Sequence, residues 1–186
     1  MTTGRAGPAL VPMALRIETD RLLLTPEGPA DADWFTALLD ARGTGAHTRD
    51  DALARIAAMT STIATTGIGV LVLRRRSDGA ALGYCGLVVG RASLEEPELA
   101  YELLPAAHGH GYATEAARAV LAAAFATGRT RIWATVRAWN EPSLRVLAKL
   151  GFRRDRSSTD AAGELVWLVR DAGPAVSGGR APSAAR

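Results

Sequence analysis

The chain has 186 residues, of which 48% are hydrophobic and 22% charged, a balance that excludes a disordered chain and fits one globular domain. No apolar run approaches the ~20 residues that a membrane helix needs, and the first residues lack the apolar stretch of a secretory signal, so we expect a cytoplasmic protein. A net charge of +3 is too small to indicate specific nucleic-acid binding. A single cysteine and three histidines without metal-ligand spacing predict neither an intramolecular disulfide nor a metal site.

Both ends of the sequence have the composition of tails. The last residues are mostly Ala, Gly, Ser and Pro with scattered Arg, and the first are small residues without periodicity. Such segments cannot bury enough apolar surface to offset the entropy lost on ordering. We therefore expect a flexible tail at 1–13, one domain at 14–170 and a disordered tail at 171–186. Met13 is an alternative start, since the patterned sequence begins just after it.

Hydrophobic periodicity, capping residues and turn residues define the elements of the domain. Strands are expected at 21–25, 68–75, 80–89, 98–104, 131–137, 152–156 and 164–170, and helices at 30–39, 49–65, 113–126 and 142–150. Thr48 with Asp51 has the pattern of a capping box, and Asp78-Gly79 is a strong hairpin signal. This order predicts an α/β (α+β) fold in which helices cover the faces of one mixed sheet.

The most informative segment joins the strand at 98–104 to the helix at 113–126. Gly109 and Gly111 stand there at a spacing of two, directly before the helix. Glycines let the backbone approach a bulky anion, and the free N–H groups of the helix point at it, so a pyrophosphate fits. An ordinary tight turn explains the same glycines equally well. The Rossmann and P-loop patterns both fail, because Thr114 replaces the third glycine and no Gly-Lys-Ser/Thr is present.

A second polar segment follows the strand at 131–137. Asn140 leaves that strand, and Ser143 lies in the first turn of the next helix. Two short polar groups at this place can face a ligand that lies between the two strands. Capping of the helix is the other interpretation, because these residue types are common caps.

Together these segments resemble the GNAT acetyltransferase superfamily, and specifically its RimJ/RimL-type branch of ribosomal-protein N-terminal acetyltransferases. The resemblance covers nearly the whole domain and is carried by the segments 17–24, 83–87, 98–101, 109–116 and 140–152. It implies a single GNAT-type domain with a twisted, mostly antiparallel mixed sheet of about seven strands and about four helices. It also implies that the strands at 98–104 and 131–137 splay apart to form a cleft for CoA.

The resemblance further implies how acetyl-CoA would be bound. Backbone around Leu103 would pair with the pantetheine chain, and Asn140 would hold it from the opposite wall. The pyrophosphate would bind at the loop, chiefly through backbone N–H groups, and the residues assigned to it are His108, Gly109, His110, Gly111, Tyr112, Ala113 and Thr114. Two positions depart from the family: His108 replaces Gln, Arg or Trp, and Leu147 replaces the Tyr that protonates the departing thiolate. In this branch Ser143 would take over that second role.

An amine with a pKa near 10 is protonated at neutral pH and must lose a proton before it attacks a thioester, so a base is required. Glu98 is the predicted base, because it lies on the strand that would present the acetyl group. Glu102 shares its face by strand alternation and is the nearest rival, and Asp160 and Glu164 in the last hairpin are further candidates. A purely structural role for Glu98 at the strand edge is equally compatible with the sequence.

The function predicted from these residues is transfer of an acetyl group from acetyl-CoA directly to a primary amine. Glu95, Glu96 and Glu98 favour a cationic acceptor. A protein or peptide N-terminus and a small-molecule amine such as an antibiotic or a metabolite are both compatible with the sequence. A CoA-binding module without turnover is a third alternative, and both a monomer and a homodimer remain open.

Overall fold

The structure is a computed structural model, and it describes residues 10–173. Its elements follow the predicted order with one additional short strand at the start. The strands are β1 (Ile17–Glu18), β2 (Leu22–Thr25), β3 (Val70–Arg75), β4 (Ala81–Val88), β5 (Glu98–Leu103), β6 (Arg131–Arg137), β7 (Arg153–Asp160) and β8 (Gly163–Asp171). The helices are α1 (Ala32–Asp40), α2 (Arg49–Thr66), α3 (Tyr112–Ala126) and α4 (Glu141–Lys149), with 3-10 turns η1 (Pro29–Asp31) and η2 (Pro105–Ala107).

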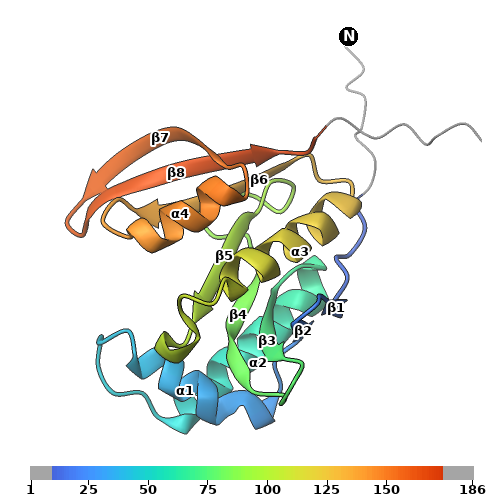
Figure 1. Ribbon diagram of the computed structural model, residues 1–186, viewed down its shortest axis with the longest axis vertical. Helices are drawn as coiled ribbons and strands as arrows, with labels where there is room; N and C mark the ends of the chain where they lie inside the picture. Colours follow the sequence, from blue (N-terminus) through green and yellow to red (C-terminus); the bar gives the residue numbers. More distant parts are fainter. Residues whose placement is uncertain (1–9, 174–186) are drawn as a thin grey trace, which may run out of the picture.

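The eight strands form one sheet in the order β1-β2-β3-β4-β5-β6-β8-β7. Every neighbouring pair is antiparallel except β5 and β6, which are parallel. Those two strands are paired only at Glu98 and Trp133, so beyond this point they separate (Figure 1). The predicted mixed, mostly antiparallel sheet with four helices is confirmed. The strand missing from the prediction is β1, which is two residues long and therefore has no alternating pattern to detect.

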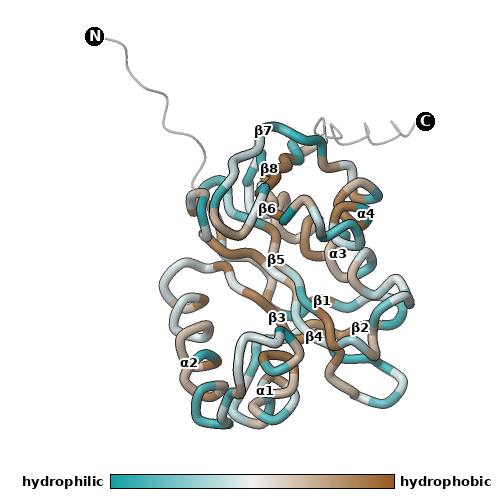
Figure 2. The backbone as a smooth tube through the Cα atoms, turned by 90° about the vertical axis from the view of Figure 1, so that its left-hand side faces the viewer, coloured by the Kyte–Doolittle hydropathy of each residue, from teal (hydrophilic) through white to brown (hydrophobic). Residues whose placement is uncertain are grey.

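Helices cover both faces of the sheet (Figure 1). Tyr84 packs against the cluster formed by α1 and α2, whereas its neighbour Cys85 faces the larger core built with α3 and α4. This is the alternation expected along a strand. Figure 2 shows that the apolar segments run along the central strands. Cys85 is fully buried, and burial raises the pKa of its thiol, so it is a core residue.

The local signals at the helix ends act as predicted. Thr48 Oγ1 accepts a hydrogen bond from the Asp51 N–H at 3.1 Å, and the Asp51 carboxylate accepts one from the Thr48 N–H at 2.8 Å. This reciprocal pair is the capping box of α2, which ends at Gly67 with a φ of 69°.

The N-terminal boundary differs from the expectation of a flexible tail at 1–13. Met13 is only 2% exposed, and its N–H donates to the Gly67 carbonyl at 2.8 Å. Its apolar side chain belongs to the core, and burying it is favourable enough to hold the segment before β1 in place. At the other end β8 continues to Asp171, one residue into the expected tail. Of the two predicted tails, residues 1–9 and 174–186 lie outside the described residues.

Two further findings concern residues 10–173 as a whole. None of the helices in this part of the chain is both long and apolar enough to cross a membrane. Within the same residues, no three His, Cys, Asp or Glu side chains gather in a way that would hold a metal ion.

Glu27, in the turn between β2 and η1, carries a buried carboxylate. Its side chain is 5% exposed, and among the described residues its Oε1 has no hydrogen-bond partner. Burial raises the pKa of Glu27 to about 7, and the nearby Asp31 adds to this, while Arg74 acts in the opposite direction. In the folded protein Glu27 therefore keeps its proton over a range in which the unfolded chain has lost it.

This difference predicts a pH-dependent stability. Because the folded state binds the extra proton, the contribution of Glu27 is present at low pH and is lost as the pH rises from 4.5 to about 7. Glu27→Gln removes this titration, so the variant should gain up to about 3 kcal/mol relative to the wild type between pH 4.5 and pH 8. Urea unfolding across this range measures the gain, with Glu141→Gln as the exposed control. Parallel stability curves for wild type and Glu27→Gln would contradict it.

Candidate active site

A cleft of about 620 Å³ opens where β5 and β6 separate. Its walls come from β5, η2, the first turn of α3, one side of α4 along its length, and the end of α1. Most of the predicted site residues line it, namely Leu103, His108, Gly109, Gly111, Tyr112, Ala113, Thr114, Asn140 and Ser143. His110 and Glu98 are not among its lining residues, whereas Tyr101 and Glu102 are.

The backbone of β5 offers an unpaired edge to the cleft. Gly83 lies opposite Leu103, and the Leu104 N–H donates to the Leu82 carbonyl at 2.8 Å, which fixes the hydrogen-bonding phase of β4 and β5. In an antiparallel pair alternate residues point their N–H and C=O groups away from the partner strand. Tyr101 and Leu103 therefore direct these groups toward β6, which has already separated. The Leu103 carbonyl is already bonded to the His108 ring, and an extended ligand can pair with the remaining groups as an additional strand.

The loop before α3 has the geometry of an anion site. Gly109 and Gly111 have φ values of 79° and 80°, which glycine adopts without the steric cost of a Cβ. Gly111 is the N-cap of α3 and has no side chain to satisfy the amides of the first turn. Those free N–H groups and the helix dipole favour a negatively charged group at this end of the cleft.

The two loop histidines take different places. His108 Nε2 lies 2.9 Å from the Leu103 carbonyl, and because a carbonyl can only accept, Nε2 carries the proton. His108 thus fastens the loop to the end of β5. The His110 ring lies beside Tyr112 at a centroid distance of 5.7 Å, and its backbone carbonyl accepts a hydrogen bond from Arg21. Both histidines thus make contacts within the protein that shape the loop, and neither makes a hydrogen bond toward the middle of the cleft.

Tyr101 and Ser143 form a hydroxyl pair on one wall. The Tyr101 hydroxyl lies 2.7 Å from Ser143 Oγ and donates to the Ser143 carbonyl at 3.2 Å. Burial raises the pKa of Tyr101 to about 12, although the hydrogen bond with Ser143 lowers it in part, so the phenol stays protonated at neutral pH. Sequence reasoning did not single out Tyr101. The available signal was strand alternation, which places it with Leu103 on the face opposite Glu98 and Glu102.

Asn140 and Ser143 also cap helix α4, as the second interpretation of the sequence predicted. Asn140 Oδ1 accepts a hydrogen bond from the Ser143 N–H at 3.2 Å, which makes Asn140 the N-cap of α4. Both residues line the cleft as well, so capping and ligand contact are compatible at this position. Leu147, by contrast, is 1% exposed and belongs to the core.

Glu102 is the carboxylate that the structure places in the cleft. It accepts two hydrogen bonds from the Arg42 guanidinium, at 2.9 and 2.5 Å, and one from the Tyr84 hydroxyl at 3.0 Å. Arg42 belongs to the connection between α1 and α2, and a third of its side chain is exposed. Glu102 therefore reaches the cleft on the face of the sheet that α1 covers, where its carboxylate is already paired with the Arg42 guanidinium.

Glu98, the predicted base, is held elsewhere. It is 5% exposed; one carboxylate oxygen accepts from the Arg91 N–H and the other from the Thr135 hydroxyl at 2.7 Å. These bonds tie β5 to β6 and to the preceding loop at the point where the two strands separate. Glu98 does not line the cleft, whereas Glu102 does, and its bonds fit the structural alternative that the sequence left open.

The two hairpin candidates lie outside the cleft, and each is paired with an arginine. Asp160 forms an ion pair with Arg137 at 2.8 Å, and this hydrogen bond lowers the pKa of Asp160, which makes it a weaker base. Glu164 is paired with Arg154 across β7 and β8. Neither carboxylate lines the cleft.

Known proteins share both this sequence pattern and this fold. Uncharacterized N-acetyltransferases of Mycobacterium bovis and Mycobacterium tuberculosis are 36% identical over 88 residues, which are 47% of this chain and 56% of each relative. The match thus spans little more than half the length of these curated relatives. A structure assigned to the GNAT acetyltransferases from Bordetella pertussis has a TM-score of 0.73 at 29% identity, over 84% of this chain and 99% of that one.

RimJ of Mycobacterium smegmatis, solved with a CoA disulfide, has a similar fold, with a TM-score of 0.71 at 24% identity over 81% of this chain and 82% of RimJ. The acetyltransferase (GNAT) domain family matches residues 21–153, which is more than half of the chain and includes β5, the glycine loop and both walls of the cleft. The chain therefore belongs to the GNAT acetyltransferase domain family.

Proposed function

We propose that this chain is an N-acetyltransferase that transfers the acetyl group of acetyl-CoA directly to a cationic primary amine. The observation that carries the proposal is the continuity of one cleft. It joins an anion site at Gly109 and Gly111 to the edge of β5 at Tyr101 and Leu103, which β6 leaves open, and it ends at Glu102. A phosphorylated thioester with a long amide-containing arm fits that sequence of environments.

In this arrangement the loop amides would bind the pyrophosphate, and the edge of β5 would pair with the pantetheine amides. Asn140 lies on the opposite wall, where its side-chain amide can contact the same arm. The thioester would then lie beside Tyr101 and Ser143. Because the Tyr101 hydroxyl donates to Ser143, the Ser143 hydroxyl is the one that can donate a hydrogen bond to the negative charge that develops on the sulfur.

We assign the role of base to Glu102. The amine loses a proton to this carboxylate, directly or through a water molecule, and its nitrogen then attacks the acetyl carbon. The new C–N bond forms as the C–S bond breaks, and the thiolate takes a proton from the Ser143 hydroxyl, which Tyr101 positions. The nitrogen then releases its remaining extra proton, which restores the Ser143 hydroxyl and leaves the neutral amide. General acid–base assistance of this kind contributes about 10²–10⁴-fold to a rate.

The class of acceptor follows from the ion pair between Glu102 and Arg42. A protonated amine can replace the Arg42 guanidinium, because both are cations that donate hydrogen bonds to a carboxylate. We propose a peptide or protein N-terminus as the acceptor. The likeness to the fold of RimJ supports this branch of the family.

Release of free thiol from acetyl-CoA tests the proposal directly. The acceptor panel comprises short peptides with free N-termini, the same peptides with blocked N-termini, aminoglycosides and polyamines. We expect thiol release and a mass increase of one acetyl group with the free peptides only. Turnover of aminoglycosides or polyamines alone would show that the acceptor is a small-molecule amine and not a peptide. No thiol release with any amine would overturn the proposed activity.

A further inference from the structure

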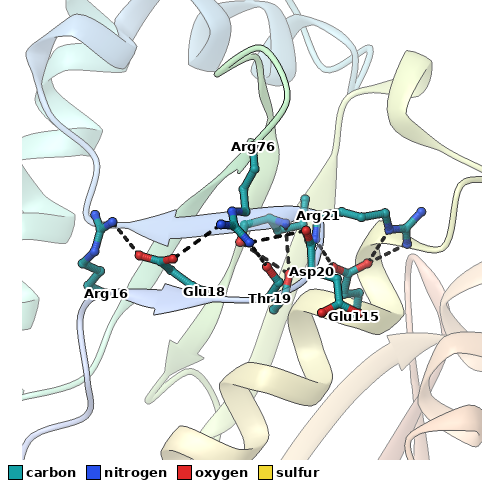
Figure 3. Close-up of polar contacts among 8 residues, drawn as sticks. Arg16, Glu18, Thr19, Asp20, Arg21, Arg76 and Glu115 are labelled. Carbon is teal, nitrogen blue, oxygen red and sulfur yellow. Dashed lines mark hydrogen bonds and ion pairs between the residues drawn. The ribbon is translucent and has the colours of Figure 1, made fainter.

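Arg21, in the turn between β1 and β2, reaches across to the glycine loop (Figure 3). Its Nε donates to Glu115 at 2.7 Å, and its Nη1 donates to the backbone carbonyl of His110 at 3.0 Å. The guanidinium carbon also lies 4.7 Å from the centre of the Tyr112 ring. One side chain therefore contacts the loop and the first turn of α3 together.

The partner of Arg21 is the carboxylate of Glu115. Glu115 lies in the first turn of α3, and it also accepts hydrogen bonds from the Thr19 hydroxyl at 2.6 Å and the Arg21 N–H at 3.0 Å. Burial opposes its ionisation, but the hydrogen bonds from Thr19 and Arg21 outweigh this and lower the pKa of Glu115. Glu115 is thus negatively charged at neutral pH, within one helical turn of the proposed pyrophosphate site.

The turn that carries Arg21 is itself anchored. Arg76, at the end of β3, donates through its guanidinium to the Thr19 carbonyl at 2.8 Å and through its backbone N–H to the Arg21 carbonyl at 2.9 Å (Figure 3). Residues 108–111 of the loop, by contrast, are exposed, and a Cβ placed on Gly109 would meet nothing within 4 Å. Polar contacts therefore hold its conformation, namely those from His108 to Leu103 and from Arg21 to the His110 carbonyl.

We propose that Arg21 is a positioning residue for the pyrophosphate of the donor. It fixes the carbonyl between the two glycines so that the loop amides face the cleft, and it offsets the charge of Glu115, which would otherwise repel a phosphate. This inference rests on the proposed placement of the pyrophosphate at the loop. It adds a residue from the N-terminal hairpin, more than eighty positions away in the sequence, to the donor site.

The experiment compares two acetyl donors, of which only one carries the pyrophosphate that Arg21 is proposed to position. Acetyl-CoA carries the pyrophosphate and the nucleotide, whereas S-acetylpantetheine carries only the thioester arm. Arg21→Ala should raise the KM for acetyl-CoA about tenfold or more and change kcat little, because a charged hydrogen bond to the loop is lost. The kcat/KM for S-acetylpantetheine should not change. Arg16→Ala is the matched control, since Arg16 lies beside the same hairpin and pairs only with Glu18 among the described contacts.

Further variants separate positioning from a general loss of structure. Arg21→Lys keeps a charge but cannot reach Glu115 and the His110 carbonyl at once, so it should show a smaller loss in the same direction, and it replaces Arg21→Ala if that variant does not fold. The double variant Arg21→Ala/Glu115→Gln should bind acetyl-CoA more tightly than Arg21→Ala alone, because no uncompensated carboxylate remains. Failure of this recovery would overturn the proposed neutralising role.

The outcomes distinguish this inference from the function on which it rests. If the wild type uses both donors with the same kcat/KM, the pyrophosphate is not bound at the loop, and the proposed donor site fails. If the wild type prefers acetyl-CoA but Arg21→Ala keeps that preference, or loses activity equally with both donors, the donor site stands and the role of Arg21 is wrong.

Discussion

Replacing Glu102 with glutamine is expected to lower kcat about 100-fold or more, because the amine loses the group that removes its proton. Gln keeps the size of the side chain and can still accept a hydrogen bond from Arg42, so the fold should be preserved. The pH–rate profile is the sharper measurement. The limb of the profile that reports the catalytic base should be present in the wild type and absent from the residual activity of the variant.

Glu98→Gln is the matched comparison, since both glutamates lie on the same face of β5. This change weakens the bond from the Arg91 N–H or from Thr135 and should lower the melting temperature. It should leave the shape of the pH–rate profile as it is in the wild type. A profile that changes with Glu98→Gln and not with Glu102→Gln would return the role of base to Glu98.

Gly111→Val is expected to weaken the binding of acetyl-CoA at least tenfold. A φ of 80° costs an ordinary residue roughly 1–2 kcal/mol, and a β-branched side chain is the least able to adopt it. The new Cβ would also lie 3.6 Å from the Arg21 guanidinium, so the branched side chain would crowd the contact that holds the loop. Both effects move the amides of the first turn of α3 away from the positions in which they would bind the pyrophosphate. Titration calorimetry with CoA measures the loss.

Gly79→Val provides the control for backbone strain. Gly79 has a φ of 73° in the hairpin between β3 and β4, and a Cβ there meets nothing within 4 Å. The substitution should therefore cost a similar amount of stability without affecting the binding of CoA. Equal losses of affinity in the two variants would show that strain in general, and not the position of the loop, weakens binding.

Much of the fold follows from local patterns. The capping pair of Thr48 and Asp51, the hairpin at Asp78-Gly79 and the periodicity of the helices depend on residues a few positions apart, so the sequence shows them directly. Gly109 and Gly111 were found for the same reason. Burial of Met13 was not foreseen, because one apolar residue in an irregular segment has no period, and its partners are supplied by the core.

In the candidate site too, local patterns could be predicted and long-range contacts could not. The glycine loop at the start of α3, the polar pair Asn140 and Ser143 and every element except β1 could be predicted from the sequence, since each is a local chemical pattern. Which glutamate enters the cleft depends on tertiary contacts, because Glu98 and Glu102 share one face of β5 and differ in what packs against them. The tertiary structure alone paired Tyr101 with Ser143 and Arg21 with Glu115, through contacts that the register of the sheet and the packing of helices on it create across long stretches of chain.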